Sequence, residues 1–139
     1  MRVYPSVFLN ARWAVRDTVL PRGGGPDGQS PCFVPKGQKV LIGINANQRR
    51  VDIWGLDADV FRPERWADEN LRPGLAYTPF STGPRICLGQ QVALTTAGYT
   101  LVRLLQACPD IENRDPRPYK EMVKVISDSA NGVLVGRRQ

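Results

Sequence analysis

Histidine is absent from the 139-residue sequence. Without an imidazole, the chain cannot form a Ser-His-Asp or Cys-His nucleophilic site, a histidine-ligated zinc site or a histidine proton relay. This absence excludes most of the familiar hydrolase chemistries. The sequence also lacks any run of about twenty apolar residues, and it does not begin with a signal-like apolar segment. We therefore expect neither a membrane span nor a signal peptide within these residues.

Cysteine and lysine are both scarce. The three cysteines, Cys32, Cys87 and Cys108, form no Cys-x-x-Cys pair. Their odd number argues against a disulfide framework, so we expect an intracellular, reducing compartment. Most of the 19 basic residues are arginine, which suits fixed bidentate contacts with carboxylate or phosphate. The basic residues spread from Arg2 to Arg138 without clustering between stacking aromatics, which disfavours a nucleic-acid-binding module.

Length and composition predict one small domain with little regular structure. A chain of 139 residues that is 42% hydrophobic can bury a modest core. The 13 glycines and 12 prolines exceed average usage, so many turns and loops are expected. By content, the sequence predicts an α+β fold.

Alternating hydrophobicity predicts two strands in the first third of the chain. One lies near residues 9–18, and the other, over residues 38–45, is long enough to pair with it. The glycines and prolines between them predict a loop over residues 22–35. Residues 48–79 predict a long meander with a short helical patch at residues 57–61.

The strongest periodic signal follows Gly89. Apolar residues recur there at intervals of three or four until Pro109 stops the pattern, which predicts a helix about 27 Å long at about 1.5 Å per residue. The usual interpretation of such a stripe is a core helix. The tail over residues 122–135 predicts a hairpin with its turn at Asn131-Gly132, between β-rich runs at residues 123–126 and 133–135.

The residues that carry chemistry lie immediately before the predicted helix. Phe80, Gly83, Arg85, Cys87 and Gly89 have the spacing Phe-x-x-Gly-x-Arg-x-Cys-x-Gly. Because Cys87 precedes a helix N-terminus, unpaired backbone N–H groups and the positive end of the dipole can stabilise its thiolate. The two glycines allow the backbone to approach the sulfur and a bound group. A lone cysteine is more often an inert buried residue, but the surrounding five-residue pattern favours a ligand.

This spacing resembles the haem-binding loop of the cytochrome P-450 family. The resemblance implies that residues 80–90 bind haem b (iron protoporphyrin IX) and that all five motif positions contribute to cofactor binding. Cys87 would be the iron ligand and the catalytic residue, Arg85 would contact a haem propionate, and Phe80 would pack over the thiolate. Arg12, on the first predicted strand, corresponds to a family position that often contacts the other propionate.

The resemblance extends along nearly the whole chain. Phe61–Trp66 is similar to the family's meander motif, in which the arginine at Arg65 joins a buried triad with a Glu-x-x-Arg helix. Arg2 resembles the arginine of that helix, and the matching glutamate lies outside the 139 residues. We therefore expect two neighbouring cations with no carboxylate between them and loose folding around the meander. The alternative is an exposed pair between Glu64 and Arg65.

Two further segments resemble the lining of the family's substrate pocket. They are Val7, Phe8 and Leu9, for which core packing is an equally good account, and the predicted hairpin tip near Ala130 and Asn131.

The subfamily resemblance is to fungal hydroxylases of alkanes and fatty acids. It rests on Gly25-Pro26-Asp27-Gly28, on Asp52-Ile53-Trp54-Gly55 and on the cysteine loop itself. Gln48 stands where those proteins often have a histidine before the Arg49-Arg50 pair, which argues against a role for this position at the haem edge.

These resemblances predict a single incomplete domain over residues 1–139, the C-terminal portion of the mainly-α cytochrome P-450 fold. The intact family hydroxylates lipophilic substrates with O2 and electrons from an NADPH-dependent reductase, at the endoplasmic reticulum membrane. The oxygen-activating helix and the membrane anchor lie outside this sequence, so we expect the fragment to bind haem with little turnover alone. The alternative is a non-catalytic haem-thiolate binding protein.

Overall fold

The two strands predicted in the first third of the chain pair with each other in the computed structural model, which describes residues 1–138. β1 (Leu9–Trp13) and β4 (Lys39–Gly43) form a two-stranded antiparallel ribbon, which confirms the predicted pairing. The strand predicted near residues 9–18 is shorter than expected, because the chain bends after β1 and the last residue of that range begins a second strand.

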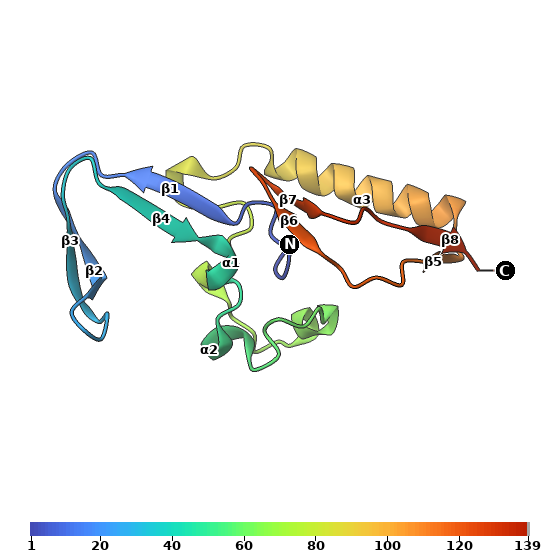
Figure 1. Cartoon of the computed structure of the whole chain (residues 1–139), viewed down its shortest axis with the longest axis horizontal. Helices are drawn as coiled ribbons and strands as arrows, with labels where there is room; N and C mark the ends of the chain where they lie inside the picture. The colour runs from blue at the N-terminus through green and yellow to red at the C-terminus, as the bar shows by residue number, and fades with distance from the viewer. Residues whose placement is uncertain (139) are drawn as a thin grey trace.

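The predicted loop over residues 22–35 is wrong, because most of it belongs to a hairpin. β2 (Thr18–Gly24) pairs antiparallel with β3 (Ser30–Val34) in a second two-stranded sheet. The glycines of this segment form its turn, where Gly25 and Gly28 have φ angles of 73° and 68°. Such left-handed angles favour glycine. In Figure 1 this hairpin projects at the end of the β1–β4 ribbon farthest from the long helix.

The meander contains short helices, but not at the predicted place. α1 (Ile44–Asn47) immediately precedes the meander, whose own helical segments are α2 (Val51–Trp54) and the 3-10 helices η1 (Pro63–Ala67) and η2 (Gly74–Ala76). Residues 57–61 instead form a turn in which Val60 N–H donates to Asp57 O, so the predicted helical patch is wrong. Gly55, with a φ of 82°, ends α2 before this segment and starts the turn.

The buried core lies where α1, α2 and η1 meet the first residues of the chain. The apolar side chains that are buried among residues 1–138 are those of Val3, Pro5, Val34, Ile44, Trp54, Ala58 and Ala76. Trp54, Trp66 and Tyr77 form an aromatic cluster with ring centroids 4.8 to 6.2 Å apart. The meander therefore contributes several of the buried side chains of the described residues, and loose folding around it stays a prediction that an unfolding measurement tests.

Arg65 is buried in this core and has several partners. Its side chain is 6% exposed and donates to the backbone oxygens of Trp54 at 3.0 Å and Asp57 at 3.1 Å. The Asp57 carboxylate lies 3.2 Å from the same guanidinium. Arg65 is therefore paired with Asp57, and not with Glu64. The Arg65 Nε and the Trp54 indole N–H are buried donors without a partner among residues 1–138.

Arg2 is buried beside Arg65, as expected. It donates to the backbone oxygens of Ala58 at 2.5 Å and Val60 at 3.0 Å, and its guanidinium lies 4.9 Å from the centre of the Trp54 ring. Burial lowers the pKa of Arg2, and the nearby Arg65 cation lowers it further. Backbone carbonyls and an aromatic face thus solvate this cation in place of a carboxylate.

Gln48 is fully buried, and no sequence signal indicated its role. Its Nε2 donates to the backbone oxygens of Met1 and Arg2, both at 3.0 Å, and its Oε1 accepts from Thr78 N–H at 3.2 Å. The residue therefore joins the N-terminal segment, the end of α1 and the chain that leads to the cysteine loop.

The predicted helix is confirmed as α3 (Gln90–Ala107), which ends before Pro109. Its interpretation as a core helix is wrong in this structure, since none of its side chains is buried; Val92, for example, is 70% exposed. Figure 1 shows α3 running along the C-terminal strands on one side of the molecule. No helix among residues 1–138 combines the length and the hydropathy that crossing a bilayer requires.

The C-terminal strands pair differently from the predicted hairpin. β6 (Glu121–Val123) pairs with β7 (Ser127–Ser129), and β5 (Ile111–Asn113) pairs with β8 (Val135–Arg137). The chain therefore turns back within the first predicted β-rich run, at residues 124–126, and this short loop lets β6 pair with β7. The Asn131-Gly132 turn follows β7 and leads toward β8.

We expect Arg65→Met to lower the free energy of unfolding of the 139-residue chain by about 2–4 kcal/mol, because buried carbonyls and the Asp57 carboxylate lose their donor. Arg62→Met is the matched control, since Arg62 contacts the same carboxylate at 3.2 Å from a half-exposed position. It should cost less than about 1 kcal/mol. Urea titration followed by tryptophan fluorescence measures both. Equal effects of the two substitutions would contradict the assigned role of Arg65.

Candidate functional site

The cysteine loop closes on itself through two backbone hydrogen bonds. Cys87 N–H donates to Phe80 O at 2.9 Å, and Ile86 N–H donates to Gly83 O at 3.0 Å. The 3-10 helix η3 (Gly83–Arg85) lies between these bonds. The local fold therefore fixes the backbone of Cys87 just before α3, as the sequence pattern predicts.

The two glycines of the motif have different structural roles. Gly83 has a φ of 73°, and a Cβ there would meet nothing within 4 Å, so its requirement is conformational and not steric. At Gly89, the cap residue of α3, a Cβ would lie 3.8 Å from the Cys87 sulfur. Any larger side chain at Gly89 would lie against the thiol, so glycine leaves that side of the sulfur open.

An apolar cavity of about 380 Å³ connects the motif to the N-terminal segment. It is lined by Met1, Ser6, Val7, Asn10, Ile44, Pro79, Phe80, Ser81, Arg85, Cys87 and Ala93. The structure thus brings Phe80, Arg85 and Cys87 to one cavity. Val7, from the segment before β1, is far from the motif in sequence but lines the same cavity, whereas Phe8 and Leu9 do not belong to this lining.

The three thiols have different surroundings. The Cys87 side chain is exposed at the cavity. Cys32 donates to Phe33 O at 3.8 Å on β3, and the Cys108 sulfur accepts from Arg137 at 3.5 Å beyond the end of α3. Neither Cys32 nor Cys108 lies in a glycine-flanked loop, and neither lines the Cys87 cavity.

Arg85 and Arg12 lie in different positions relative to the cavity. Arg85 lines it and is exposed. Arg12 lies on β1 and donates to Asn10 Oδ1 at 3.0 Å and to Ala11 O at 2.8 Å. Asn10 lines the cavity and Arg12 does not, so Arg12 is linked to the cavity through its hydrogen bond with Asn10.

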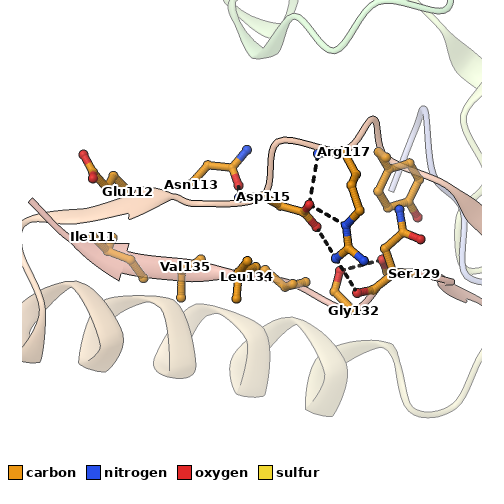
Figure 2. A pocket seen from close by; sticks show the side chains of 12 residues that line it. Ile111, Glu112, Asn113, Asp115, Arg117, Ser129, Gly132, Leu134 and Val135 are labelled. Carbon is orange, nitrogen blue, oxygen red and sulfur yellow. Dashed lines mark hydrogen bonds and ion pairs between the residues drawn. The ribbon is translucent and has the colours of Figure 1, made fainter.

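The predicted pocket segment near Ala130 and Asn131 lies elsewhere. Asn131 lines a second cavity of about 380 Å³, which β5, β8 and the turn after β7 enclose. Figure 2 shows the side chains that line this cavity beside the long helix, with Leu134 and Val135 pointing toward the helix and Arg117 at the end opposite Glu112. The Cys87 sulfur does not belong to its lining.

The donor set at the first cavity fits a thiolate-ligated haem. It offers one thiol, apolar walls and one guanidinium suited to a carboxylate. The backbone N–H groups of Leu88 and Gly89 form no hydrogen bond with residues 1–138. They remain available to stabilise a thiolate at the start of α3.

Comparison with known proteins supports the family resemblance over nearly the whole sequence. The family model described as Cytochrome P-450 matches residues 1–132. The chain is 52% identical over 135 residues to cytochrome P-450 monooxygenase fsdH from Fusarium heterosporum, covering 97% of this chain and 24% of that protein. It is 48% identical over 142 residues to cytochrome P-450 52E1 from Candida apicola, covering 96% of this chain and 27% of that protein.

A third relative, cytochrome P-450 52A3-A from Candida maltosa, is 46% identical over 140 residues, which cover 99% of this chain and 27% of that protein. The chain thus spans about a quarter of the length of the curated relatives that it matches. With a family model matching nearly all of the sequence and relatives at about half identity, the chain belongs to the cytochrome P-450 family.

Proposed function

We propose that this chain is the haem-binding C-terminal portion of a cytochrome P-450 monooxygenase, a single incomplete domain of the mainly-α family fold. Membership of the family implies a haem cofactor, and we propose haem b held by residues 80–90. One observation carries the proposal: Phe80, Arg85 and Cys87 share an apolar cavity with β1-side residues, and Cys87 precedes α3 in a closed loop.

Each motif residue has a defined task in this proposal. Cys87 supplies the thiolate that holds the iron, and the Leu88 and Gly89 N–H groups stabilise its charge. Arg85 pairs with a propionate, and Phe80 shields the sulfur from water. Arg12 orients toward the second propionate through a side-chain movement away from Asn10. Thiolate-bound haem supplies the oxygen activation that hydroxylates unactivated C–H bonds.

The full-length protein's substrate and partners follow by analogy. We propose a lipophilic small molecule, an alkane or a fatty acid, as the substrate, and an NADPH-dependent reductase as the electron donor. An endoplasmic reticulum location belongs to the same proposal. The support is the resemblance of the Gly25–Gly28 and Asp52–Gly55 segments to fungal hydroxylases, together with the fungal and yeast relatives.

A second function is non-catalytic haem-thiolate binding by the 139-residue chain itself. The observation that favours it is that the thiol, the apolar walls and the guanidinium of the Cys87 cavity all belong to these 139 residues. The two functions are distinguished by adding haem, NADPH, a fungal reductase and a fatty acid to the chain. Reductase-dependent hydroxylated product supports catalysis, and haem binding without product supports the second function.

We expect Cys87→Ala to abolish the red-shifted Soret band that thiolate ligation gives the ferrous carbonyl complex of the haem-reconstituted chain. Cys32→Ala and Cys108→Ala are matched controls and should keep the band, because neither thiol lines the cavity. Absorption spectra of the three variants measure this. If either control lost the band and Cys87→Ala kept it, the ligand assignment would be wrong.

We expect Arg85→Leu to raise the rate of haem loss about tenfold to a hundredfold without moving the Soret band, since a charge-assisted hydrogen bond contributes about 1.5–3 kcal/mol when shielded from water. Transfer of haem to apomyoglobin measures this rate. Arg103→Leu, on the exposed surface of α3, is the control and should leave the rate unchanged. A haem loss rate equal to that of the unmodified chain would remove Arg85 from the site.

A further inference from the structure

The turn after β7 contains a chemically labile pair that the haem site does not involve. Asn131 precedes Gly132, whose φ is 71°. An asparagine carboxamide is attacked most readily by the backbone nitrogen of a following glycine, because no Cβ crowds the nitrogen. A Cβ at Gly132 would meet nothing within 4 Å, and the residue is exposed, so water reaches the turn.

Arg117 contacts the peptide group that would supply the attacking nitrogen. Its guanidinium pairs with both oxygens of Asp115, at 2.7 and 2.8 Å, and donates a further hydrogen bond to Asn131 O at 3.2 Å. Figure 2 shows the Arg117 side chain reaching from the Asp115 segment to the turn at Ser129 and Gly132. Asp115 thus holds the guanidinium at the carbonyl of the Asn131–Gly132 peptide bond.

This contact stabilises the reactive form of the peptide group. When Gly132 N–H loses its proton, the negative charge is shared between the nitrogen and Asn131 O, the atom that accepts from Arg117. A hydrogen bond to a charged acceptor is stronger than one to a neutral acceptor. Arg117 therefore favours deprotonation of this peptide group.

The remaining contacts leave the reacting atoms accessible. Gly132 N–H donates to Ser129 O at 3.4 Å, close to the upper limit for a hydrogen bond. The carboxamide of Asn131 is held on one side, where Nδ2 donates to Pro118 O at 3.2 Å. Nothing in these contacts shields the Asn131 carboxamide carbon from the Gly132 nitrogen.

We propose that Asn131 is a site of spontaneous deamidation activated by Arg117. The Gly132 nitrogen forms a bond with Asn131 Cγ, the bond from Cγ to Nδ2 breaks, and ammonia leaves with the proton that Gly132 gave up. Water then opens the cyclic imide at either carbonyl, which gives aspartate or isoaspartate. The reaction consumes one water, releases one ammonia and needs no oxidant or reductant.

The modification changes the wall of the second cavity. The new carboxylate cannot donate to Pro118 O, and it adds a negative charge beside Arg117, where it competes with Asp115 for the guanidinium. In the isoaspartate product the main chain is lengthened at the turn between β7 and β8. Loss of the Asn131 carboxamide therefore loosens the turn that closes the cavity.

The test follows ammonia release and peptide mass at Asn131 in the purified 139-residue chain at neutral and mildly alkaline pH, in buffer and in concentrated urea. We expect the native chain to deamidate faster than the unfolded chain, and Arg117→Gln to slow the native reaction about threefold to tenfold, the effect of one charge-assisted hydrogen bond at a partly exposed site. Arg117→Lys should restore part of the rate.

Arg114→Gln is the matched control. Arg114 is an exposed arginine of the same region that pairs with Glu112 at 2.7 Å and does not contact the turn. This substitution should leave the rate unchanged, and in urea all variants should react at the same rate. A native rate at or below the rate in urea, or equal slowing by Arg114→Gln and Arg117→Gln, overturns the proposal.

Discussion

Donation from three buried polar side chains to backbone carbonyls holds the segments of this chain together. Arg2, Gln48 and Arg65 are each at most 6% exposed, and their partners come from the N-terminal segment, α1, α2 and the turn after α2. Carbonyls buried in a meander with few regular ladders need such donors, because water cannot reach them. The arrangement of the meander therefore depends on side-chain donors to an unusual degree.

This network also positions the cysteine loop. Gln48 accepts from Thr78 N–H, two residues before Phe80, whose carbonyl then accepts from Cys87 N–H. The thiol is thus connected to the core by a short series of hydrogen bonds that runs through the backbone. Its direct surroundings are apolar and open, while its position is set by polar contacts several residues away. A thiol positioned in this way can keep its place without tight packing around the sulfur.

The sequence predicted the parts of the molecule that local patterns determine. Helix α3 and the pairing of β1 with β4 follow from hydrophobic periodicity, and the cysteine loop follows from fixed spacing. The pairing of β2 with β3 was missed because its glycines and prolines signal a turn but not the strands on either side. Gln48 and Asp57 were missed because their partners are distant in sequence and no periodicity marks a buried polar contact. The exposure of α3 could not be predicted, because hydrophobic periodicity shows which face of a helix is apolar but not whether another element covers that face.

Each of the four sheets described here consists of two strands, and only some of their strands reach the core. A two-stranded sheet has marginal stability by itself, so its amides can exchange with solvent through local opening. In the β2–β3 hairpin, which projects from the molecule in Figure 1, exchange should need far less free energy than around Arg65. We therefore expect the amides of the hydrogen-bonded meander to stay protected while the two-stranded sheets open locally.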